Sequence, residues 1–102
     1  MENSYDSYQT RKNVLTIGND EIPFNYQINE VLEVFNMVIV RLESPKDTVF
    51  NENVFGVSRT EKKIIWQVPN LDYRSEINCP FVGMKFINNQ LYLNNWCDIY
   101  NN

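Results

Sequence analysis

Residues 53–68 read NVFGVSRTEKKIIWQV, and this stretch decides the fold that the sequence predicts. Two apolar runs, 54–57 and 64–68, flank the polar and charged residues 58–63. β-Branched and aromatic side chains suit a pleated, half-buried surface, and two such runs around a short polar loop are typical of an antiparallel hairpin. The stretch therefore predicts a hairpin, and nothing in it indicates catalytic chemistry.

Other short β-prone runs lie on both sides of this hairpin. We expect strands over 13–17, 38–42, 81–87 and 91–96, and turns at 18–20 and 36–37. Asn88 and Asn89 form the turn between the last two strands, because asparagine tolerates positive φ better than most residues. Residues 43–52 and 69–80 are expected to be irregular connections.

Residues 24–34 allow two interpretations. The apolar residues at 24, 26 and 28 alternate with polar ones, as in a strand that starts after Pro23. A helix over 28–35, with Asn29 as its N-cap, fits the same apolar positions. We favour the strand because the segment contains several β-branched residues, and the helix stays open as the alternative.

Strands joined mostly by short turns predict a mainly β fold. An antiparallel meander of this kind forms a small sandwich, a partly open barrel or a single covered sheet. A chain of 102 residues fits one domain, which we place at 13–102. Residues 1–12 are polar and show no sustained period, so they are expected to be a flexible N-terminal tail.

The composition argues against catalysis and against metal binding. The chain has no histidine, which removes the commonest general base and the commonest metal ligand. Cys79 and Cys97 are the two cysteines, and no other cysteine or histidine could complete a zinc site. We expect both to be free thiols, with a disulfide as the alternative. No enzyme activity, cofactor or metal is therefore predicted.

The sequence also carries predictions about compartment. Residues 1–12 contain no apolar segment of the kind found in signal peptides. No apolar run approaches the roughly 20 residues that a membrane-spanning helix needs. We therefore expect a cytoplasmic protein without a membrane partner, in a compartment that keeps thiols reduced.

The charge distribution suggests a protein partner. The net charge is −4, and residues 20–52 hold seven carboxylates against two cations, a balance of −5. Such a surface repels phosphate backbones, which disfavours direct nucleic-acid binding, and it attracts a basic protein mainly by speeding association. The candidate contact residues are Glu30, Glu33, Glu43, Asp47 and Glu52. Glu30 and Glu33 are expected on opposite faces of a strand, which excludes a shared acid–base or metal site.

The two tryptophans leave another question open. Trp66 and Trp96 each lie in a β-prone run, where they would serve as core anchors. Exposed tryptophans are also frequent anchors of protein interfaces, so either role fits the sequence.

Two resemblances bear on fold and function. One resemblance is to the hairpins of quinoprotein-type β-propeller blades, and it rests on the segment VFGVSRTEKKIIWQV and on residues 90–93 after the Asn88–Asn89 turn. This likeness implies blade-like hairpins and no functional residue. The chain is small and acidic, contains pairs of asparagines and lacks catalytic residues. In these features it resembles the small acidic immunity proteins that accompany bacterial toxins, including those of contact-dependent inhibition systems.

The second resemblance implies a non-catalytic protein that neutralises a basic toxin domain. The alternative is a structural or self-associating β-domain, since edge-prone strands with few charged residues invite pairing with another chain. The sequence does not decide between these two functions.

Overall fold

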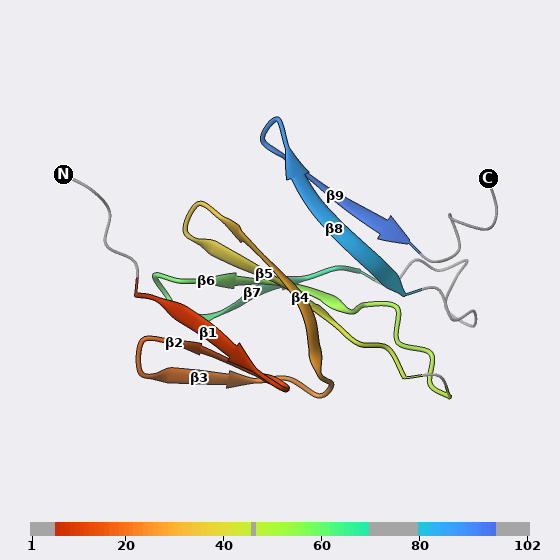
Figure 1. The fold of residues 1–102 in the computed structure, drawn as a ribbon, viewed down its shortest axis with the longest axis horizontal. Helices are drawn as coiled ribbons and strands as arrows, with labels where there is room; N and C mark the ends of the chain where they lie inside the picture. The colour runs from red at the N-terminus through yellow and green to blue at the C-terminus, as the bar shows by residue number, and fades with distance from the viewer. Residues whose placement is uncertain (1–5, 46, 70–79, 96–102) are drawn as a thin grey trace.

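The computed structural model describes residues 6–45, 47–69 and 80–95, and within them the chain forms strands and turns without a helix (Figure 1). The strands are β1 (Tyr8–Arg11), β2 (Val14–Ile17), β3 (Asp20–Pro23), β4 (Ile28–Val34), β5 (Met37–Leu42), β6 (Val54–Ser58), β7 (Lys63–Gln67), β8 (Phe81–Ile87) and β9 (Gln90–Asn95). They pair in antiparallel fashion in three sheets, in the orders β1-β2-β3, β4-β5-β6-β7 and β8-β9. The mainly β, antiparallel prediction is confirmed, and none of the three sheets closes into a barrel.

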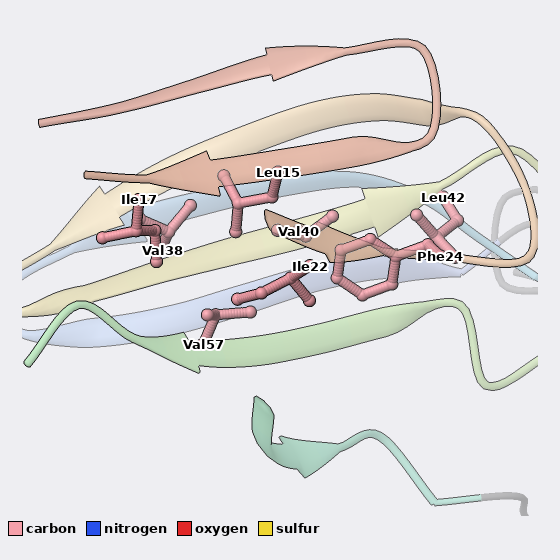
Figure 2. Packing of buried hydrophobic residues seen from close by; sticks show 8 residues of the cluster. All are labelled: Leu15, Ile17, Ile22, Phe24, Val38, Val40, Leu42 and Val57. Atoms are coloured by element: carbon pink, nitrogen blue, oxygen red, sulfur yellow. The ribbon is translucent and has the colours of Figure 1, made fainter. Parts of the chain in front are cut away.

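The three sheets are stacked, with β4–β7 in the middle (Figure 1). One face of the middle sheet packs against β1–β3, and their side chains form the larger apolar cluster, shown in Figure 2. This cluster consists of Leu15, Ile17, Ile22, Phe24, Val38, Val40, Leu42 and Val57. The other face carries Ile39 and Val54, which meet Met84 of the β8–β9 hairpin. The structure is thus a sandwich with a third layer.

Strand β5 shows why this arrangement follows from the sequence. Successive side chains of a strand point to opposite faces, so Val38 and Val40 face β1–β3 while Ile39 faces β8–β9. All three are buried. A strand covered on both sides needs an apolar residue at every position, and this accounts for the uninterrupted run in 38–40.

Residues 24–34 form neither one long strand nor a helix. Ile28–Val34 is strand β4, so the strand prediction is confirmed there and the helix alternative is wrong. The chain reaches it through non-strand residues that follow β3, and Phe24 among them is buried against Phe55 at 5.0 Å between ring centroids.

Two strands were missed because their sequences are polar. Asp20–Pro23 forms β3, so the turn predicted at 18–20 is one residue too long. The sequence of β3 is polar because only Ile22 of this strand faces the core. Tyr8–Arg11 forms β1 inside the segment predicted to be a tail, and it pairs with β2 in a regular register. Residues 1–5 lie outside the described part of the chain.

The turns and hairpins follow the sequence closely, with one shift. Asn88 and Asn89 have φ of 53° and 64° and join β8 to β9, as predicted. The turn expected at 36–37 lies one residue earlier, because Val34 pairs with Met37 and leaves Phe35 and Asn36 as the connection.

The hairpin from which the fold was predicted is β6–β7. Trp66 is half-buried and packs in the cluster that includes Ile39 and Met84, so it serves as a core anchor on the middle sheet. The prediction for Trp96 and those for Cys79 and Cys97 fall outside the described residues. In the part of the chain that the structure describes, no helix has the length and apolarity required to cross a membrane.

Candidate protein-binding surface

Glu30 and Glu33, two of the five candidate contact residues, take part in internal ion pairs. They lie on β4 and point to opposite faces of the middle sheet, as their spacing requires. Arg41 Nε donates to Glu30 Oε1 at 2.8 Å, on the partner strand β5. Arg59 Nη1 donates to Glu33 Oε2 at 2.7 Å. Both carboxylates therefore face a cation of their own chain.

Arg59 holds separate parts of the chain together. Its side chain is only 9% exposed, and besides Glu33 it donates through Nη2 to the carbonyl oxygen of Asp6 at 2.8 Å. Its guanidinium also lies 5.3 Å from the centre of the Tyr8 ring. A buried arginine in this setting stabilises the fold and is not available as part of a basic surface.

The other three candidates lie on the connection between β5 and β6, which we call the acidic loop (residues 43–53). Glu43 and Asp47 are exposed and Glu52 is half-buried. None of the three carboxylates forms an ion pair within the part of the chain that the structure describes. The acidic loop therefore offers three carboxylates at one end of the middle sheet (Figure 1).

Hydrogen bonds close the base of the acidic loop. The Leu42 N–H donates to the Asn53 carbonyl oxygen at 2.8 Å, and the Asn53 side-chain amide donates back to the Leu42 carbonyl at 2.9 Å. The same amide group binds the start of β8: it donates to the Phe81 carbonyl at 2.9 Å and accepts from the Phe81 N–H at 3.0 Å. Within the loop, Ser44 Oγ donates to the Phe50 carbonyl at 3.2 Å. These contacts limit the conformations that the loop can adopt.

A different surface lies at the opposite end of the middle sheet. Phe35 is 70% exposed in the β4–β5 turn and has a φ of 55°, a conformation that bulky residues rarely adopt. Its ring meets Phe86 edge-on at 5.9 Å, and the neighbouring Ile87 is also exposed. The tips of the β4–β5 and β8–β9 hairpins thus share an apolar patch, separated from the acidic loop by the length of β5.

Lys62 is the described ionisable group whose pKa departs clearly from its ordinary value. The hydrogen bond and charge of Asp6 raise the pKa of Lys62 above its ordinary value of 10.5, through a 2.7 Å contact from Nζ to Oδ2. A lysine with a raised pKa stays protonated near neutral pH and is a poor base. Among the described residues, no three of the carboxylate, thiol and imidazole groups lie together as metal ligands would.

Comparison with known protein families adds the following. A family described as a domain of unknown function, DUF7957, matches residues 5–100. The chain belongs to this family. No curated protein and no solved structure matches the chain. The DUF7957 match includes β1 through β9, so the family's domain comprises all three sheets of Figure 1.

Sequence reasoning missed the residues that shape the surface of this DUF7957 domain. Nothing local sets Asn53 apart from the other asparagines, because its partners lie in β5 and β8. Arg59 looked like one of several charges in a polar turn. Phe35 had a detectable signal, since a two-residue turn between Val34 and Met37 would have required an unusual φ there.

Proposed function

We propose that this DUF7957 domain is a non-catalytic protein-binding module, and specifically an immunity protein that neutralises a basic bacterial toxin domain. The observation that carries the proposal is the acidic loop, where Glu43, Asp47 and Glu52 have no cation of their own chain within the described residues. The net charge of −4 adds to the attraction for a basic partner.

The acidic loop suits electrostatic recognition. Its base is held by the Leu42–Asn53 pair, so little order has to be gained on binding. Exposed carboxylates at a rim act mainly on the association rate. Glu30 and Glu33 contribute less in this proposal, because Arg41 and Arg59 already neutralise them.

The first test asks whether there is a toxin to neutralise. The protein is co-expressed in bacteria with the toxin domain encoded beside its own gene. The proposal requires that growth is restored and that the two proteins co-purify. Absence of a toxic neighbour, or a toxicity that the protein does not relieve, contradicts the immunity function.

The second test locates the contact. The triple variant Glu43→Lys, Asp47→Lys and Glu52→Lys should slow association with the toxin domain, and added salt should slow association of the wild type in the same way. The matched control reverses Lys63 and Lys85, which are exposed and lie outside the loop. An equal effect of the control, or an affinity that does not respond to salt, rejects the acidic loop as the contact.

A second candidate function, self-association, is favoured by strand β7. This strand ends the middle sheet, and Ile64 and Ile65 are 39% and 46% exposed on it. Unpaired edges with apolar side chains invite a further strand, although Lys63 and the β-bulge near Gly56 oppose this. Sedimentation analysis distinguishes the two functions: a dimer that Ile65→Lys converts to a monomer supports self-association, and a wild-type monomer excludes it.

A further inference from the structure

The outer face of the three-stranded sheet carries a hollow of about 250 Å³. Leu15 and Ile17 point into the core, so Val14 and Thr16 point outwards and form its floor. Arg11 pairs with Val14 in the register, and Glu21 pairs with Thr16. Lys12 and Asn13, in the β1–β2 turn, complete the wall on the side of Arg11. The hollow has two cations on one side and a carboxylate on the other.

These charges form no ion pair within residues 6–45, 47–69 and 80–95. Arg41, Arg59, Lys62 and Lys63 each lie within 4 Å of a carboxylate oxygen. Arg11, Lys12 and Glu21 form no ion pair within the described residues, although all three line the same hollow. Exposed Lys85 also forms no ion pair in this part of the chain, so what distinguishes the hollow is that it brings two such cations and one such carboxylate together.

The turn that carries the cations is firmly held. Lys12 has a φ of 56°, and its carbonyl oxygen accepts from the Ile28 N–H at 2.8 Å. The Asn13 side-chain amide donates to the Phe24 carbonyl oxygen, and the Phe24 N–H donates to the Asn13 carbonyl oxygen, both at 2.8 Å. The backbone of the turn that carries Lys12 is therefore set before any ligand arrives, so only side chains have to be ordered on binding.

The spacing of the strands that carry the charges indicates the length of a ligand. Arg11 lies on β1 and Glu21 on β3, and the backbones of these strands are two strand spacings or roughly 10 Å apart across the sheet. The acid and amine of a single α-amino acid are too close together to reach both sides. Three extended residues span roughly 10 Å, so the two ends of a tripeptide match this distance.

We propose that this hollow binds short peptides by their two ends, with the free carboxylate at Arg11 and Lys12 and the free amine at Glu21. The Thr16 hydroxyl lies on the floor between these ends and can bond to the peptide backbone. The site is independent of the acidic loop, and it stands or falls separately from the immunity function.

The experiment follows backbone amide resonances while triglycine, N-acetyl-triglycine or triglycine amide is added. Triglycine should shift the amides of Lys12, Thr16 and Glu21 in a saturable manner. Blocking either end should weaken binding roughly two- to fivefold, the range that solvent-exposed ion pairs allow. Two variants report which end of the peptide binds on which side of the hollow. Glu21→Gln should abolish the difference in affinity between triglycine and N-acetyl-triglycine. The double variant Arg11→Gln, Lys12→Gln should abolish the difference in affinity between triglycine and triglycine amide.

The control is Lys85→Gln, which removes an exposed cation from another sheet and should leave all three affinities unchanged. All these positions are exposed, so the variants are expected to fold. The proposal is overturned if triglycine produces no saturable shift, if the blocked peptides bind as well as the free one, or if Lys85→Gln has the same effect as the changes in the hollow.

Discussion

Gly56 illustrates how a single position is set by a neighbour across the sheet. It lies on β6 opposite Trp66 of β7, and the indole ring covers its Cα. A Cβ at position 56 would overlap Cε2 and Nε1 of that ring. A large aromatic side chain at 66 therefore requires glycine at 56.

The first prediction follows from this contact. Gly56→Ala should lower the free energy of unfolding by about 1–3 kcal/mol, because the indole has to move from a packed position. Urea denaturation measures the loss. Gly83→Ala is the comparison, since its Cβ would meet the exposed Asn94 side chain at 3.2 Å and that side chain can turn away. Equal losses in the two variants would show that packing on Trp66 is not the cause.

Phe35 is the residue with the clearest conflict between conformation and side chain. Asparagine tolerates positive φ, whereas phenylalanine at φ 55° is strained. The T-shaped contact with Phe86 offsets part of this strain and is worth about 0.5–1.5 kcal/mol.

The second prediction compares two replacements of Phe35. Both Phe35→Asn and Phe35→Ala lose the ring contact, but only asparagine relieves the strain. The Asn variant should therefore be more stable than the Ala variant by roughly 0.5–1 kcal/mol in urea denaturation. An Ala variant that equals or exceeds the Asn variant would mean that the backbone at 35 is not strained.

At the scale of elements, a buried side chain attaches the β8–β9 hairpin to the middle sheet in addition to the apolar packing of Met84. The Asn53 side chain is 1% exposed and makes three hydrogen bonds, two of them to Phe81 at the start of β8. It acts as a bridge where the acidic loop ends and β6 begins, because one amide pairs with the backbone of both β5 and β8.

The third prediction removes this bridge. Asn53→Ala should cost about 2–4 kcal/mol, because buried backbone groups of Leu42 and Phe81 lose their partners. Amide hydrogen exchange should accelerate in β8 and β9 more than in β2, since the hairpin loses its hydrogen bonds to Asn53 and keeps only its apolar packing. Asn25→Ala is the control at an exposed asparagine. Uniform acceleration across all strands would mean that Asn53 supports the whole fold and not this attachment.

At the scale of the whole molecule, the outer sheet β1–β3 is attached to the middle sheet through charges as well as through the apolar cluster. Lys62, beside β7, pairs with Asp6, which precedes β1, at 2.7 Å, and lies 3.9 Å from Asp20 of β3. Arg59 reaches the Asp6 carbonyl from the same turn. These contacts hold a segment that the sequence alone suggested to be a tail.

The fourth prediction concerns pH. The pKa of Lys62 is raised in the folded protein, first by its hydrogen bond to Asp6, so the bridge stabilises the fold fully below 10.5 and is lost as the pH rises through the folded value. The difference in Tm between wild type and Lys62→Gln should stay constant from neutral pH to about pH 10 and then shrink. A difference that persists at higher pH would show that the lysine acts through its apolar stem.

The sequence could predict elements whose causes are local. Asn88 and Asn89 specify their own turn, and the run 38–40 specifies a strand covered on both sides. The acidic balance of 20–52 was visible, but the sequence could not show that Arg41 and Arg59 neutralise Glu30 and Glu33. Of the candidate site, the members in the acidic loop form no ion pair within the described part of the chain.

The sequence by itself determined the mainly β fold class and the apolar strands, because alternation and turn chemistry act over a few residues. The tertiary structure decided the rest. β1 and β3 became strands because β2 supplied a pairing edge, in spite of their polar sequences. Asn53 and Arg59 acquired their roles from partners 11 to 53 residues away in the sequence, separations that no local pattern encodes. Pairing of strands within the middle sheet brought Glu30 beside Arg41 and Glu33 beside Arg59, contacts that span 11 and 26 residues of sequence.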